Sequence, residues 1–342
     1  MHQGPLQSGQ IQRHILRTIA ATSLLLSAVH LHASVALLME EPYGEFGAYN
    51  PTGHAAVYLN HICAESPTRL RPCRPDEYGV VISRYHKIHH DDWIAIPLIP
   101  YLYAVDNVSD IPATVDKGKV EELRDAAWRI HLQLLAPATA SGEPPKGEWT
   151  QLVGASYDRT IHGFQVDTTA DQDDRFMAIF NDRRNVGHFN LLFHNCADFS
   201  REVLDTYFPH AIHRNYVGDM GVMTPKQAAN MLVKYGKKHP ELHMTAFVIP
   251  QVPGTVRRST RIDGVAESLV KSKKYIIPLA VISPEVSGAL VADYLVQGRT
   301  HLPKKAVMFE IGDDVDGKQI PVTLPGETAP GQSQSTAPSP SI

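Results

Sequence analysis

The feature that most constrains the fold is a short apolar run followed at once by an amphipathic segment. Residues Phe189–Phe193 are mostly apolar, which is typical of a buried strand. From Phe199 to Tyr207, large apolar side chains recur every four residues, which predicts a helix that begins at Cys196. Asn195 has the side chain of a helix N-cap. The sequence therefore predicts a strand followed directly by a helix, with a cysteine in the first helical turn.

A cysteine in that position is a candidate nucleophile. Unpaired backbone N–H groups and the positive end of the helix dipole stabilise a thiolate. The alternative is a small core residue, because free cysteine is among the most buried residue types. A nucleophile needs a base, and the candidate is His54, which follows the turn residue Gly53 and starts a predicted strand. The alternative role of His54 is a buried polar contact within that strand.

A third group is needed to orient the base. Segments 54–62 and 78–85 both have strand composition, and we expect them to pair antiparallel across the loop between them. The end of the second strand would then lie beside His54. His86 is the first candidate for the orienting group and Tyr85 the second, although a one-residue change of register would exchange the faces.

These residues carry a resemblance to a known group of proteins. Gly53-His54 at the start of a strand, followed much later by Asn195-Cys196 and an amphipathic helix, resembles circularly permuted papain-like cysteine proteins. That branch includes lecithin–retinol acyltransferase-like enzymes and periplasmic lipoprotein acyltransferase domains of bacteria. The resemblance covers about Ala36 to Gln251, and its specific content is the two short motifs and their order.

The resemblance implies a site and a chemistry. Cys196 would be the nucleophile and His54 the general base, while backbone N–H groups around Cys196 would form an oxyanion hole. Asn195 would position this site as the N-cap of the helix. The chain has no histidine soon after His54 on a neighbouring strand, so the third member stays open, with His86 as the candidate. No cofactor and no metal are expected.

The whole chain is expected to fold as α+β, with an antiparallel sheet packed against helices in a permuted papain-like core. The domain expected over 37–251 is followed by a helical, apolar region over 252–311 and a disordered Pro/Ser/Thr-rich tail over 312–342. The composition predicts further strands at 35–39, provided that cleavage spares it, and at 244–249, and helices at 117–135, 170–181 and 225–235. The segment Thr168–Asp171 would cap the second of these helices and Thr224 the third.

Residues 1–36 resemble an export signal. Two arginines precede an apolar core, and Ser34-Val35-Ala36 fits a cleavage site, with an uncleaved N-terminal anchor as the alternative. We therefore expect a periplasmic or cell-envelope protein. Cys63 and Cys73 could form a disulfide in an oxidising compartment, and a zinc site is the competing interpretation. Either arrangement would leave Cys196 as the free thiol.

Composition limits the other function classes. A net charge of −4 and the lack of a basic patch with interleaved aromatic residues argue against a nucleic-acid binder. His86 to Asp92 contains several potential metal ligands, but their spacing matches no known helical metal motif, and a solvated loop is favoured.

The sequence therefore favours an exported cysteine-dependent acyl hydrolase or acyltransferase that forms an acyl-cysteine on an ester or amide substrate. Lipid acyl groups are favoured because segments 93–103 and 275–296 are strongly apolar. Segment 275–296 is interrupted by prolines and charges, so we expect a packed hairpin, with contact to a membrane surface as a possible role. The alternatives are a cell-wall peptide amidase of the same fold and a non-catalytic structural protein of the envelope.

Overall fold

The computed structural model describes residues 33–44, 47, 51–86, 88, 90–187, 189–216, 218–298 and 306–309. Within these residues the chain forms a seven-stranded sheet of order β6-β5-β2-β1-β7-β8-β9, antiparallel except where β9 joins β8. A separate hairpin consists of β3 and β4. The strands are β1 Ser34–Glu40, β2 His54–Leu59, β3 Ile62–Ser66, β4 Arg69–Pro72, β5 Val80–Ser83, β6 Ile94–Pro97, β7 Ile161–Asp167, β8 Thr245–Ile249 and β9 Val307–Met308.

Helices are interleaved with the strands along the chain. The α-helices are α3 Leu98–Tyr103, α4 Lys117–Ala127, α5 Ala155–Asp158, α6 Ala170–Asp182, α7 Cys196–Tyr207, α8 Pro225–Lys238, α9 Val265–Lys271, α10 Lys273–Ile282 and α11 Pro284–Asp293. The shorter helical segments are η1 Val108–Asp110, η2 Trp128–Leu132, η3 Glu148–Leu152, η4 Gly218–Gly221, η5 Pro240–Leu242 and η6 Tyr294–Gly298. The fold is therefore α+β, as the sequence predicts.

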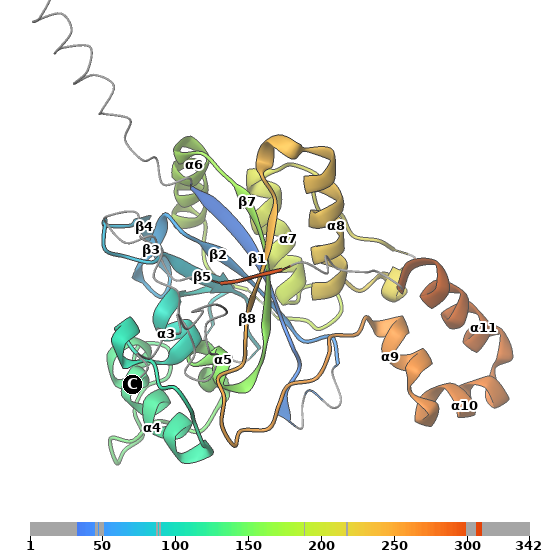
Figure 1. Cartoon of the computed structure of the whole chain (residues 1–342), viewed down its shortest axis with the longest axis horizontal. Coiled ribbons are helices and arrows are strands. Elements are labelled where there is room, and N and C mark those ends of the chain that lie inside the picture. The colour runs from blue at the N-terminus through green and yellow to red at the C-terminus, as the bar shows by residue number, and fades with distance from the viewer. Residues whose placement is uncertain are drawn as a thin grey trace, which may run out of the picture. The chain divides into compact units, whose positions relative to one another are not determined.

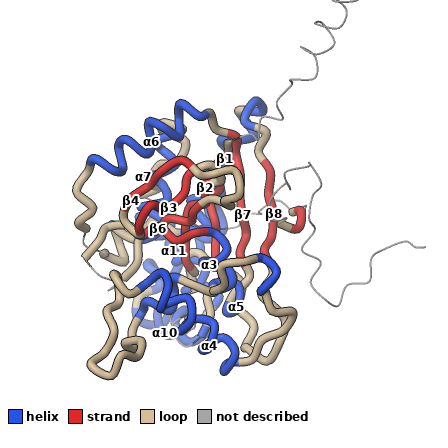
Figure 2. The backbone as a smooth tube through the Cα atoms, turned by 90° about the vertical axis from the view of Figure 1, so that its left-hand side faces the viewer, coloured by secondary structure: helices blue, strands red, loops and turns tan. Residues whose placement is uncertain are grey.

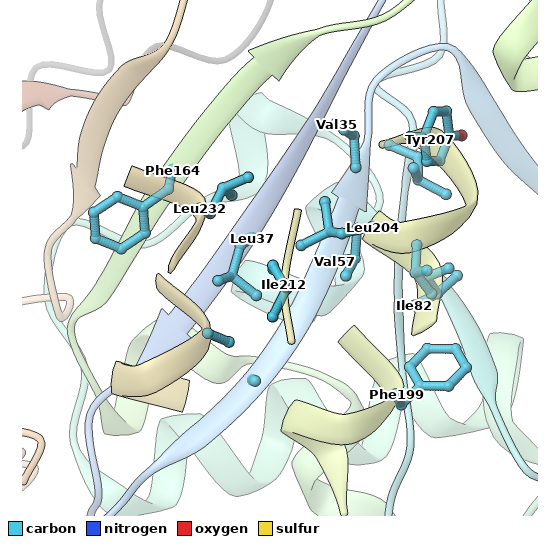
Figure 3. Packing of buried hydrophobic residues seen from close by; sticks show 14 of the residues in the cluster. Val35, Leu37, Val57, Ile82, Phe164, Phe199, Leu204, Tyr207, Ile212 and Leu232 are labelled. Atoms are coloured by element: carbon cyan, nitrogen blue, oxygen red, sulfur yellow. The ribbon is translucent and has the colours of Figure 1, made fainter. Parts of the chain in front are cut away.

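The sheet is covered on both faces, because successive side chains of a strand point to opposite sides. In β1, Leu37 packs in one cluster with α6, α7 and α8, whereas its neighbour Leu38 packs in another with α3, α4 and α5. Figures 1 and 2 show the helices of the two layers on either side of the strands. Figure 3 shows the first cluster, in which side chains from the strands meet those of α7 and α8; it includes Val35, Leu37, Val57, Leu204 and Leu232.

Several predicted elements are confirmed. The strand predicted at 35–39 is β1, and β2 pairs antiparallel with β5. Thr169 caps α6 by accepting the backbone N–H of Gln172, and Thr224 caps α8 in the same way. These elements carry strong local signals, because side-chain caps and long periodic apolar patterns are recognisable without the tertiary structure.

The strand predicted over Phe189–Phe193 is wrong. Leu191 to Phe193 form a turn, closed by a bridge between Asn190 and His194, and these three apolar side chains are 57%, 52% and 60% exposed. The side chain of Asn190 accepts the backbone N–H groups of Leu192 and Phe193, which stabilises the turn. A short apolar run does not distinguish a buried strand from an exposed turn.

The first predicted domain boundary falls inside the central strand. β1 lies between β2 and β7, and Val35 and Ala36 are fully buried and paired on both sides. A boundary after residue 36 would therefore divide this strand. Residues 1–32, which hold most of the predicted export signal, and the predicted disordered tail at 312–342 lie outside the described residues.

The C-terminal region contributes to the sheet as well as to helices. Segment 275–296 forms α10, α11 and part of η6, broken at Ser283, and β9 adds to the edge of β8. Among the described residues, no helix combines the length and the apolar character that crossing a membrane would require. Cys63 and Cys73 form a disulfide across the β3–β4 hairpin.

Candidate functional site

Asn195 shapes the start of α7. Its side-chain oxygen accepts the backbone N–H groups of Ala197 at 2.9 Å and Asp198 at 3.0 Å. Its side-chain nitrogen donates to the carbonyl oxygens of Leu191 and Met223, both at 3.0 Å. Both amide hydrogens are therefore used within the protein. Asn195 positions the helix and the preceding turn, and it has no N–H left for a substrate oxygen.

Cys196 is the first residue of α7 and lies against β2. The thiol is buried, and among the described cysteines it is the free one. Burial raises the pKa of Cys196 to about 11, although hydrogen bonds from the backbone N–H groups of Ala55, Ala197 and Cys196 itself lower it. The helix N-terminus thus acts on the sulfur as the sequence predicts, but loss of hydration outweighs it. The resting thiol is protonated at neutral pH.

The Cys196 sulfur contacts Ala55 of β2 at the point where the pairing of β2 with β5 ends. Ser83 Oγ donates to the carbonyl oxygen of Ala55 at 2.7 Å, so this residue presents its polar groups toward β5. The N–H and C=O of one strand residue point to the same side. Because β5 ends at Ser83, the Ala55 N–H has no partner in a β5 ladder, and the Cys196 sulfur accepts it instead.

His54, the residue before Ala55, is held by two groups from β5 and the segment after it. Its Nε2 lies 3.1 Å from Ser83 Oγ, and its ring stacks on Tyr85 with centroids 5.0 Å apart. The Ser83 hydroxyl hydrogen is donated to Ala55, so the hydroxyl accepts from His54. His54 is therefore the Nε2–H tautomer, with the lone pair on Nδ1. Burial, with the charge of Arg159, lowers the pKa of His54 to about 3, so the ring is neutral.

The predicted third member, His86, contacts Phe189 in the structure. His86 is exposed, and its ring lies against Phe189 at 5.2 Å between centroids. The antiparallel β2–β5 register brings the end of β5 to His54, as expected, but the groups there are Ser83 and Tyr85. Sequence reasoning missed Ser83. The available signal was a single polar residue at the end of the apolar strand Val80–Ser83.

A buried ion pair lies beside His54 in the sheet. Glu40 is the register partner of His54 on β1, and its carboxylate forms a salt bridge with Arg159 at 2.9 Å and accepts a hydrogen bond from Tyr101. Burial raises the pKa of Glu40, which the charge of Arg159 opposes. The negative charge of Glu40 also contributes to the raised pKa of Cys196, after burial. Sequence reasoning did not identify these residues, because a carboxylate at the end of an apolar run is typical of the start of a turn.

A second ionic network supports the other side of the α7 N-terminus. Arg84 donates two hydrogen bonds of 2.7 Å to Asp92 and lies over the ring of Phe199. Arg183 and His194 also contact Asp92, at 3.1 and 3.2 Å. Asp92 is thus paired with the two arginines, which leaves it unsuited to the metal site considered for His86–Asp92. His89 of that segment lies outside the described residues.

The remaining candidate ligands give no separate metal centre within the described ranges. The group of potential ligand atoms found there consists of Cys63, Cys73 and Glu77. The two sulfur atoms are bonded to each other, and Glu77 pairs with Arg71 at 2.5 Å. A disulfide offers no thiolate to zinc. Segment 93–103, whose apolar character favoured lipid acyl groups, forms β6 and α3 and is buried almost throughout.

In comparisons with known proteins, no family model, curated protein or solved structure matches this chain. The geometry of the site is therefore the basis for a functional assignment.

Proposed function

We propose that this chain is an exported, thiol-dependent acyl hydrolase or acyltransferase that uses Cys196 as the nucleophile and His54 as the general base. The observation that carries the proposal is the contact of the Cys196 sulfur with Ala55, the chain neighbour of His54. Cys196 begins a helix whose first N–H groups surround its sulfur, and that sulfur accepts the N–H of Ala55, next to His54. For catalysis, the Cys196 sulfur must reach a ring nitrogen of His54.

The proposed reaction begins from neutral groups. Cys196 Sγ attacks the carbonyl carbon of an ester or amide while its proton moves to Nδ1 of His54. The alcohol or amine leaves with that proton and gives an acyl-Cys196 thioester. Water or another acceptor then attacks the thioester, and the proton it loses returns through His54 to the sulfur. Backbone N–H groups at the start of α7 would bind the carbonyl oxygen as it gains negative charge.

Ser83 and Tyr85 would serve as positioning residues for the base. Ser83 accepts the Nε2 hydrogen of His54 and so keeps the lone pair on Nδ1. Tyr85 stacks on the ring and limits its rotation. The exposed apolar turn of Leu191 to Phe193 directly precedes the cysteine helix and supports a fatty acyl group as the substrate.

Incubation of the full chain with fatty acyl p-nitrophenyl esters tests the reaction. We expect an acyl adduct on Cys196 by intact mass and peptide mapping, and loss of the adduct in Cys196→Ala. His54→Gln should slow acylation by about 10²–10⁴-fold, because it removes the base. His86→Gln is the matched control and should leave the rate unchanged. Equal ester cleavage by wild type and Cys196→Ala would contradict the proposal.

A non-catalytic structural role is the second candidate, and a specific observation favours it. The Cys196 thiol is buried, its pKa is raised to about 11 by burial, and it belongs to the apolar cluster between the sheet and α7. A packed core thiol would show slow iodoacetamide labelling at neutral pH in both wild type and His54→Gln, with no acyl adduct. Labelling that slows in His54→Gln would argue against this role.

A further inference from the structure

The hairpin formed by α10 and α11 leaves its apolar surface uncovered. Of the ten residues of α10, none is buried, although the helix is mostly apolar after Lys273 and Lys274. In α11 only Ser287 and Leu290 are buried. Figure 1 shows α10 and α11 as a hairpin that has α9 beside it. Helices this short are marginal in water unless their apolar face packs on something.

Within α10, side-chain exposure increases toward the tip of the hairpin. Val281 and Ile282, at the end of α10, are 80% and 81% exposed, whereas Tyr275 near the start is 48% exposed. The base is attached to the rest of the chain. Asp293 of α11 accepts the backbone N–H of Asp219, and Ala266 of the preceding helix α9 is buried. The hairpin therefore presents a free apolar tip on an anchored base.

The lysines of the hairpin lie at its base, at the end opposite the apolar tip. Lys273 and Lys274 are exposed at the base of α10, and Lys274 lies over the ring of Tyr275. Between Lys274 and Asp293 the one charged side chain is Glu285, in the first turn of α11. Cations and a tyrosine beside an apolar segment match the boundary between lipid headgroups and acyl chains.

The dimensions also agree with one leaflet. Each helix has ten residues, so it is about 15 Å long. A single leaflet contributes about 15 Å of hydrocarbon. The exposed apolar side chains belong to both helices and include Ile277, Val281, Ile282 and Val286. In α10, Val281 and Ile282 are neighbours in the chain and therefore point about 100° apart around the helix. A bilayer covers all sides of an inserted tip, whereas a second protein copy would cover one stripe.

We propose that the α10–α11 hairpin binds the surface of an anionic lipid bilayer, with Val281 and Ile282 in the acyl region and Lys273 and Lys274 at the headgroups. Glu285 near the tip opposes this insertion, because a carboxylate is costly to remove from water. This binding is independent of the proposed reaction at Cys196.

Vesicle flotation of the full chain tests the binding. We expect the chain to float with phosphatidylcholine vesicles that contain phosphatidylglycerol and to bind pure phosphatidylcholine more weakly. The pair Val281→Asp and Ile282→Asp should weaken binding by roughly tenfold or more. Lys273→Glu with Lys274→Glu should remove the preference for anionic vesicles, and Glu285→Gln should strengthen binding. The matched control is Ile130→Asp with Leu134→Asp, two side chains that are 65% and 75% exposed on another surface.

A local probe separates the hairpin from the apolar N-terminal segment of the chain. In Ile282→Trp, brominated lipids should quench the new tryptophan, because the native Trp93, Trp128 and Trp149 are buried. Absence of quenching in a vesicle-bound chain would overturn the proposal. So would a dimer in light scattering that Val281→Asp with Ile282→Asp dissociates without any effect of vesicles, because the occupant would then be a second copy. An inactive chain that still binds vesicles would reject the acyl chemistry alone.

Discussion

At the scale of single residues, the protonation of the site follows from a hydrogen-bond count. Ser83 has one hydroxyl hydrogen and gives it to the carbonyl oxygen of Ala55, so it accepts from His54. Burial lowers the pKa of His54 and raises that of Cys196. Both shifts favour neutral groups, so the pair is a thiol and an imidazole at rest. In the proposed reaction, the thiol proton would move to the imidazole as the sulfur attacks the acyl carbon.

The lowered pKa of His54 predicts an acid-sensitive fold. The unfolded chain takes up a proton at this histidine below its ordinary pKa of 6.5, but the folded chain does so only near 3. The free energy of unfolding should therefore be fully retained above pH 6.5 and fall toward pH 3, by at most about 1.4 kcal/mol per pH unit. Denaturant unfolding of wild type and His54→Gln at several pH values measures it. Between pH 6.5 and pH 3, the free energy of unfolding should fall more steeply for wild type than for His54→Gln. His86→Gln should behave as wild type.

At the scale of elements, one cap connects the turn, the helix and the thiol. Asn195 accepts two N–H groups of α7 and donates to Leu191 and Met223, so its side chain joins three segments. The apolar turn before it is exposed, although its composition predicts a buried strand. The hydrogen bonds of Asn190 and Asn195 determine the conformation of the turn, and this conformation exposes its apolar side chains.

Loss of this cap should loosen the start of α7. We expect Asn195→Ala to lower the free energy of unfolding by about 1–2 kcal/mol and to increase the iodoacetamide labelling rate of Cys196, because the first turn then opens more often. Thr169→Ala removes the cap of α6 and is the matched control. It should also destabilise the fold but leave labelling of Cys196 unchanged. Equal labelling in wild type and Asn195→Ala would show that Asn195 does not protect the thiol.

At the scale of the whole molecule, the sheet depends on a strand that begins inside the predicted export signal. Val35 and Ala36 are fully buried between β2 and β7, with helices above and below. The folded unit therefore needs the chain from about Ser34 onward. A cleavage after Ala36 would remove the first three residues of β1.

Two truncations test this requirement. A chain without residues 1–32 should keep the thermal unfolding transition of the full chain. A chain without residues 1–36 should lose at least about 3 kcal/mol, because it loses a buried valine and ladder hydrogen bonds on both sides of β1. Thermal unfolding followed by circular dichroism compares them. Equal transition temperatures would contradict the central role of Ser34–Ala36. In an exported chain, N-terminal sequencing should place the mature end before Ser34.

The sequence by itself determined the elements with strong local signals. The cysteine helix, the caps at Thr169, Asn195 and Thr224, the first strand and the antiparallel pairing of β2 with β5 all follow from periodicity and capping side chains. Cys196 and His54 were selected by the same signals, because each stands at the start of an element. Their assigned roles remain predictions.

Only the tertiary structure decided what surrounds those residues. Ser83 reaches His54 because β5 ends beside it, where the sequence had placed only Tyr85 and His86 as candidates, and Glu40 forms a salt bridge with Arg159. These contacts depend on strand register and burial, which local sequence does not encode. Burial also decided the protonation of the site: the helix terminus alone would lower the pKa of Cys196, but removal from water raises it to about 11.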